Sequence, residues 1–110
     1  MKQFLVIYHA PAEAMAEMST NTGEENAKVM EEWMAWKAKT GNAVTDFGNP
    51  VMGGHATLEG ASWTQSDREV GGYSLLQGES FEAVQGLFAD HPHLSSHPKA
   101  SLEVHEIIPM

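Results

Sequence analysis

The sequence predicts one α+β domain, built from two strand-helix-strand units that share a single sheet. The chain has 110 residues, enough for one hydrophobic core but not for two. Strand-like and helix-like segments alternate in the order β-α-β, then a long polar excursion, then β-α-β again. Two split units in a chain of this length are typical of a ferredoxin-like βαββαβ sheet, with both helices on one face. The excursion adds an extra hairpin-like segment to this fold.

The first unit begins with a β-branched and aromatic run at Lys2–Tyr8, which favours a strand. Ala12–Asn21 can hold only a loose helical turn. Thr22 lies three residues before Glu25, which is the spacing of a capping box, so the long helix begins there. Gly41 ends it. Four small or apolar side chains recur at three- and four-residue steps and are expected to face the core: Ala27, Met30, Met34 and Ala38.

The second strand, Ala43–Phe47, is followed by a Gly-rich polar stretch that reaches Gly72. This excursion contains two weak strand-like pieces, His55–Leu58 and Ser62–Thr64. The second unit then has a strand at Gly72–Gln77, a helix capped by Ser80, a loop rich in His and Pro, and a last strand. The helix ends before Pro92, and the last strand covers Leu102–Ile108.

The strands carry apolar residues on both of their alternating faces. Phe4–Tyr8 shows this most clearly, and Leu75 and Ile107 repeat it in two other strands. Two helices cover only one face of a four-stranded sheet, so the other face needs a different cover. We therefore expect a symmetric homodimer in which two sheets enclose a shared core.

Charge and composition exclude several classes of function. Six Lys and Arg residues stand against fifteen Asp and Glu residues, for a formal net charge of −9. This balance disfavours nucleic acid and anionic membrane surfaces as partners. The chain has no cysteine, which excludes disulfides, thiol catalysis and thiolate metal sites. No apolar run is long enough to span a bilayer, and the one at Phe4–Tyr8 is too short for a signal peptide, so we expect a cytoplasmic protein.

The histidines are the main candidates for chemistry, because no serine-nucleophile or phosphate-loop motif is present. Three of the six lie between Asp90 and His97. His91, His93 and His97 with Asp90 offer metal donors at unspecific spacing. Alternatively, one of these histidines acts as a general acid or base that a carboxylate orients. The third alternative is a solvent-facing loop that caps the preceding helix.

Three other side chains have both a structural and a functional explanation. Trp63 lies in a polar stretch, where an aromatic residue lines a pocket or an interface or else covers the core. Asp46 precedes a Gly-Asn-Pro turn and either forms that turn or takes part in catalysis. The tryptophans of the long helix, Trp33 and Trp36, are expected to pack against the sheet.

The chain resembles the YCII-related proteins, also called the DGPF-domain family, in a mostly uncharacterised bacterial branch. Two short segments are the most specific, Gly71–Ser74 and His91–Leu94. The resemblance covers nearly the whole chain, as one domain over residues 1–110. It is carried by MKQFLVIYHAP, EEWMAWKAKTGNAVTDFGNP, GGYSLLQGESFEAV, HPHL and LEVHEIIPM.

The resemblance implies a ferredoxin-like fold assembled as a dimeric α/β barrel. It also implies that some relatives are lyases acting on hydroxylated aromatic compounds with a His–Asp pair. That pair does not carry over, because His91-Pro92 replaces the Asp-Pro pair and Trp33, Met34 and Trp36 occupy the region of the helix histidine. The DGPF tetrapeptide is absent too. His93, in its Pro-His-Leu setting, is the residue that matches this branch.

Two functions follow from these observations. The first is a homodimeric small-molecule protein and cofactor-free lyase or hydrolase, with no metal, in which His93 acts as acid or base helped by His91 or Asp90. Its pocket is lined by Tyr8, Asp46 and Trp63. The second is a non-catalytic binding or accessory module whose acidic surface attracts a basic protein partner. The sequence leaves enzymatic activity open.

Overall fold

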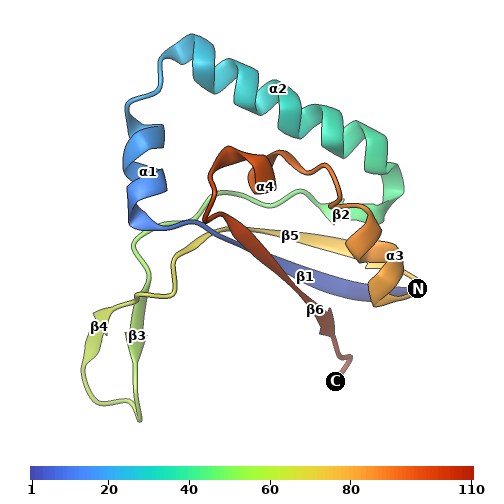
Figure 1. Cartoon of the computed structure of the whole chain (residues 1–110). Helices are drawn as coiled ribbons and strands as arrows, with labels where there is room; N and C mark the ends of the chain where they lie inside the picture. The colour runs from blue at the N-terminus through green and yellow to red at the C-terminus, as the bar shows by residue number, and fades with distance from the viewer.

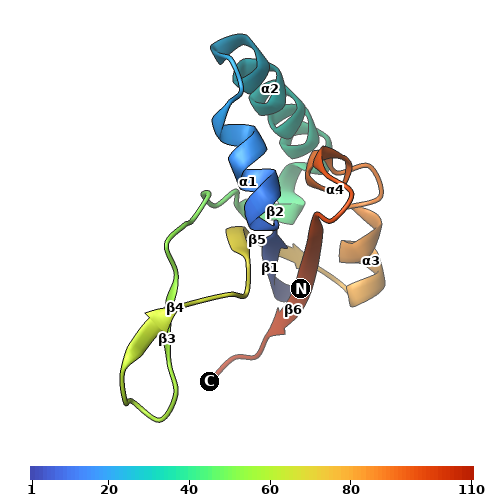
Figure 2. The same ribbon diagram turned by 60° about the vertical axis from the view of Figure 1, so that its left-hand side comes forward.

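The computed structural model describes residues 1–110 and shows an α+β fold with its helices on one side of an antiparallel sheet (Figures 1 and 2). The main sheet has the strand order β2-β5-β1-β6. Its strands are β1 (Lys2–His9), β2 (Val44–Asp46), β5 (Val70–Gly78) and β6 (Ser101–Ile107). A separate hairpin pairs β3 (His55–Thr57) with β4 (Trp63–Gln65). The helices are α1 (Ala12–Ser19), α2 (Gly23–Thr40), α3 (Phe81–Gly86) and α4 (Pro92–Ser96), with a short 3₁₀ turn, η1, at Gly41–Ala43.

The predicted alternation of the main strands with two helices is confirmed, and β1 lies in the middle of the sheet. Helix α1 forms where only a loose helical turn was predicted. Val6 of β1 lies opposite Ser74 of β5 on one side and Val104 of β6 on the other. Because side chains alternate between faces, every second residue of β1 points toward the helices. The core follows this alternation and consists of Phe4, Val6, Tyr8, Trp36, Leu76, Val84 and Phe88.

The long helix begins as predicted but turns a different face to the sheet. The hydroxyl of Thr22 accepts from the Glu25 N–H at 3.1 Å, and the Glu25 carboxylate accepts from the Thr22 N–H at 3.2 Å. The predicted core stripe is wrong, however, because Met30 is 58% exposed while Trp36 is 4% exposed. Each indole buries far more apolar area than an alanine or methionine of that stripe, so the two tryptophans decide which face turns inward.

The segment between α3 and β6 also differs from the prediction. The second helix ends before Pro92, as predicted, although already at Gly86, and the predicted loop contains the short helix α4. Glycine is a poor helix former, which explains the early end. Proline has its φ angle preset for the first helical position, so a new helix starts at Pro92, and the His91 ring caps it.

The polar excursion forms a projecting hairpin, which we call the arm and define as residues 51–69. Both strand pieces predicted there are present, as β3 and β4. Figures 1 and 2 show the arm leaving the end of the main sheet on the side away from α2. Its tip is exposed, with Leu58 at 82% and Trp63 at 66%.

The face of the main sheet that points away from the helices, which we call the open face, is uncovered in the single chain. Its centre is apolar and half-buried, and the sheet does not close into a barrel. The apolar residues of this face are Leu5, Ile7, Tyr73 and Leu75, with Ile107 at its border. None of the helices is long and apolar enough to cross a lipid bilayer.

Candidate functional site

The His91-Pro92-His93 segment lies between α2 and the central strand, where α4 begins. Aromatic rings of three elements surround it. Tyr8 comes from β1, Trp33 and Trp36 come from α2, and Phe88 follows α3. The two histidines of the segment differ in burial and in their hydrogen bonds.

His91 is a core residue, only 1% exposed. Its ring centroid lies 4.4 Å from those of both Trp33 and Trp36, and it stacks on Tyr8 at 5.3 Å. Its Nδ1 accepts a hydrogen bond from the His93 N–H at 3.0 Å, so the neutral ring carries its proton on Nε2. Nε2 is buried and has no hydrogen-bond partner.

Burial also changes the proton affinity of His91. Desolvation lowers its pKa from 6.5 to about 4, with a smaller contribution from His93 in the same direction, while Asp90 opposes the shift. The cause is that a low-dielectric surrounding disfavours the charged imidazolium. His91 is therefore neutral at physiological pH and acts as a helix cap inside the core.

His93 has the geometry of an oriented acid–base group. Its Nε2–H donates to the carbonyl oxygens of His9 at 2.9 Å and of Ser101 at 2.8 Å. Both acceptors are main-chain groups, so they fix the proton on Nε2 and leave Nδ1 as an acceptor. Nδ1 is therefore left without a hydrogen-bond partner in the chain and is not enclosed.

Tyr8 is a core residue whose ring packs beside His91 and His93. The Ser74 hydroxyl donates to the Phe47 carbonyl at 2.7 Å, so the Tyr8 hydroxyl donates to Ser74 Oγ at 3.0 Å. Burial raises the pKa of Tyr8 to about 12, although the hydrogen bond to Ser74 acts in the opposite direction. The phenol thus stays neutral, and its ring lies 5.2 Å from the rings of both Trp33 and His93.

Asp90 pairs with a lysine of α2 and does not bind the histidine rings. Its carboxylate pairs with Lys39 Nζ at 2.5 Å, and both side chains are exposed. The hydrogen bond and charge of Lys39 lower the pKa of Asp90. An open groove of about 310 Å³ lies here and is lined by Glu32, Ala35, Trp36, Lys39, Asp90, Pro92 and Ser95. Asp90 therefore borders this groove and makes no hydrogen bond to either histidine ring.

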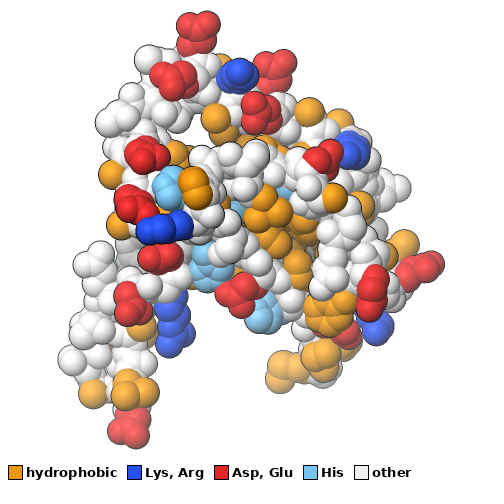
Figure 3. Space-filling view, viewed as in Figure 1, with side chains coloured by type: hydrophobic (Ala, Val, Ile, Leu, Met, Phe, Trp, Pro, Cys, Tyr) orange, Lys and Arg blue, Asp and Glu red, His pale blue; other side chains and the backbone are white.

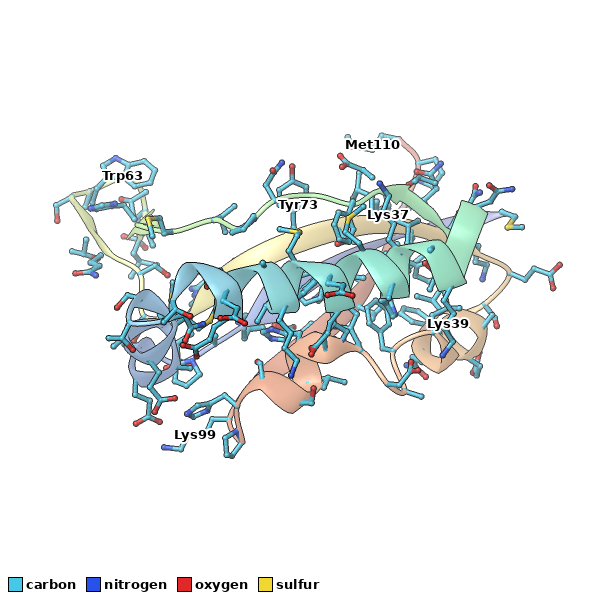
Figure 4. The ribbon with its side chains drawn as sticks, turned by 90° about the horizontal axis from the view of Figure 1, so that it is seen from above. Lys37, Lys39, Trp63, Tyr73, Lys99 and Met110 are labelled. Carbon is cyan, nitrogen blue, oxygen red and sulfur yellow. The ribbon has the colours of Figure 1, made fainter.

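The other two predicted ligand-binding residues lie elsewhere. The Asp46 carboxylate accepts from the Gly48 N–H at 2.9 Å, which is the turn-forming arrangement given as its structural explanation. Trp63 lies on the arm, at the opposite end of the molecule from Lys39 (Figure 4). Of the six predicted site residues, the structure brings Tyr8, His91 and His93 together.

The histidines of this segment do not converge as metal ligands. His97 Nδ1 accepts from the Lys99 N–H at 3.1 Å, and His91 and His93 each use one ring nitrogen on a main-chain group. No group of three or more His, Asp or Glu side chains in the chain is arranged to hold a metal ion.

A second histidine cluster on the open face was not predicted. Glu103 lies between two histidines, with one carboxylate oxygen on His9 Nε2 and the other 3.1 Å from His105 Nε2. Hydrogen bonds from His9 and then His105 lower the pKa of Glu103. His9 Nδ1 donates to the Arg68 carbonyl at 2.8 Å, which ties the end of the arm to β1. Alternation of residues along β6 places Glu103 and His105 on one face, but only the sheet register brings His9 to them.

The fold and the site define a small α+β protein with a main-chain-oriented histidine beside buried aromatic rings. No protein-family model and no curated protein sequence matches the chain. Among solved structures, it is similar to the 5-chloro-2-hydroxyhydroquinone dehydrochlorinase TftG from Burkholderia phenoliruptrix AC1100, determined with 2,5-dihydroxybenzoquinone. The identity is 14%, the TM-score is 0.48, and the match covers 92% of this chain and 90% of that one. This similarity is too low to assign a family, a site or an activity to the chain, so its membership of the YCII-related family stays a prediction.

Proposed function

We propose that the protein binds a small cyclic or aromatic organic molecule beside α4, and that His93 transfers a proton in a cofactor-free lyase or hydrolase reaction. The observation that carries this proposal is the pair of main-chain acceptors on His93 Nε2. A general base needs a partner that fixes its tautomer and leaves the other nitrogen accessible. The His9 and Ser101 carbonyls supply that partner.

The aromatic surroundings support a flat, largely apolar ligand. The rings of Tyr8 and Trp33 lie 5.2 Å and 6.4 Å from the His93 ring. Tyr8 is buried, but the partly exposed Trp33 ring offers a surface for a planar molecule, and a few polar groups then fix its orientation. The neutral Tyr8 phenol, bound to Ser74, adds no competing charge.

A ligand screen by thermal shift tests the binding step. Hydroxyaromatic acids and small cyclic lactones are added to the wild-type protein and to His93→Gln. We expect at least one compound to stabilise the wild type, by about 2.7 kcal/mol at 100 times its dissociation constant. Chemical-shift changes in Tyr8 and Trp33 locate the ligand. If no compound of either class binds, or binding shifts only distant residues, the proposal fails and a non-catalytic accessory module is favoured.

We also propose that the protein is a homodimer in which a second copy covers the open face. A compact 12.0 kDa monomer exposes about 6,000 Å², whereas this chain exposes 7736 Å². The excess is larger than the roughly 800 Å² that each partner buries in an interface of standard size. Leu5, Ile7 and Leu75 give the open face an apolar centre. Two sheets packed there would form the dimeric α/β barrel predicted from the sequence.

Light scattering tests the homodimer. We expect twice the 12.0 kDa chain mass for the wild type at micromolar concentration. Leu75→Glu places a charge at the centre of the proposed interface, so it is expected to give a folded monomer. Met30→Glu, on the exposed side of α2, is the matched control and stays dimeric. A monomeric wild type contradicts the proposal, as does a Leu75→Glu variant that remains a folded dimer.

A further inference from the structure

We propose that the arm packs against a second copy of this chain, with Trp63 and Leu58 as its anchoring side chains. This inference rests on the proposed homodimer and adds a second contact surface to the one on the open face. It also gives Trp63 the interface role that was one of the explanations of its position in a polar stretch.

The arm lacks a surface to pack on within its own chain. It is a two-stranded hairpin with three residues in each strand. His55 lies opposite Gln65 at one end, and Thr57 lies opposite Trp63 at the other. Every residue from Leu58 to Gln65 is exposed. An isolated two-stranded hairpin is at best marginally stable in water, because it has no core to bury its apolar side chains. A second protein surface that covers Trp63 and Leu58 would bury these apolar side chains and stabilise the hairpin.

The base of the arm is fixed, so its direction is defined. The Ala10 N–H donates to the Glu69 carbonyl at 3.0 Å, and the Val51 N–H donates to the Gly71 carbonyl at 3.1 Å. His9 Nδ1 adds its hydrogen bond to Arg68 at 2.8 Å. These bonds attach both strands of the arm to the end of the sheet. The arm then extends past the open face, on the side where the second copy is proposed to lie (Figures 1 and 2).

The tip of the arm carries little charge, which suits contact with a second copy of this acidic chain. The chain carries a net charge of −9, with acidic side chains visible over α1 and α2 (Figure 3), and the charged residues of the arm other than Glu59 lie at its base, at Asp67, Arg68 and Glu69. Glu59 is the single charged residue from position 51 to 65. On the open face, both oxygens of Glu103 are already bound by His9 and His105. The tip of the arm and the open face therefore offer apolar contact with little charge, which suits an equally acidic copy of the chain.

The shape of the chain fits an assembly in which each copy reaches over the other. The radius of gyration is 15.3 Å, against about 13 Å for a compact chain of 110 residues. A two-fold dimer repeats each contact, so both arms are buried together when one of them is. The extra length and the excess exposed surface are then both accounted for by one partner.

Fluorine NMR of the full chain labelled with 5-fluorotryptophan tests the arm contact. The chain has three tryptophans, and the Trp63 signal is assigned by its absence in Trp63→Phe. In the dimer we expect Trp63 to show a small solvent isotope shift, close to that of buried Trp36. In the Leu75→Glu monomer, Trp63 is expected to show the large shift of an exposed indole.

Sedimentation velocity over a dilution series gives the strength of the contact. Trp63→Ala is expected to raise the dimer dissociation constant by about tenfold or more, as loss of a buried tryptophan anchor does. Met30→Ala, an exposed apolar residue on the helix side, is the control and leaves it unchanged. If the wild type is a monomer, the homodimer and the arm contact both fail. If it is a dimer with an exposed Trp63 signal and Trp63→Ala dissociates no more readily, only the arm contact is overturned.

Discussion

Replacing His93 with glutamine is expected to lower turnover by about 10²–10⁴-fold, the usual contribution of a general acid or base. The glutamine amide can still donate to the His9 and Ser101 carbonyls that hold the His93 ring. It has no basic nitrogen at the position of Nδ1, so proton transfer is lost while the fold is kept. Ligand affinity should change much less than turnover, because the rings of Tyr8 and Trp33 remain.

Steady-state kinetics on a compound identified by the binding screen measure this effect. His55→Gln is the matched control, since His55 is an exposed histidine on the arm. Unfolding curves of the two variants verify that both are folded. If His93→Gln turns over as fast as the wild type while binding the same ligand, His93 has no role in proton transfer.

Acid is expected to destabilise the protein through His91. Its pKa is about 4 in the folded chain and 6.5 when unperturbed, so the unfolded chain binds the proton first as the pH falls. The stability that comes from a neutral His91 is fully present above pH 6.5 and is lost between 6.5 and about 4. Over this window the free energy of unfolding should fall by about 3 kcal/mol.

Urea unfolding between pH 7 and pH 4 measures this loss. His91→Asn keeps a side-chain oxygen that can accept from the His93 N–H but removes the titrating ring. The other exposed carboxylates are common to both proteins, so the difference between the two pH profiles reports His91 together with its coupling to Asp90. Identical profiles would mean that His91 is protonated, or solvated, at a pH close to its ordinary value.

The elements that the sequence predicts well are those with local signals. The capping box of Thr22 and Glu25 lies within one turn, and β-branched runs define β1 and β6. The stripe of Met30 and Met34 has helical spacing too, yet it is exposed. Periodicity shows that a helix has an apolar side, but the larger indoles of Trp33 and Trp36 decide which side the sheet covers.

The candidate site was only partly predictable for a related reason. A carboxylate was expected to orient the histidine, and the nearest one in sequence, Asp90, pairs with Lys39 instead. Main-chain carbonyls carry no sequence signal, because every residue has one. The orienting role of His9 and Ser101 therefore could not be inferred from residue types.

The sequence by itself determined the α+β order, the start of α2 and the presence of His93 in a Pro-His-Leu setting. Only the tertiary structure decided that His91 is buried, that His93 presents Nδ1, and that the arm projects past the open face. The physical reason is distance along the chain. Capping and strand preference act between near neighbours, whereas burial and hydrogen bonding to β1 and β6 depend on segments that only folding brings together.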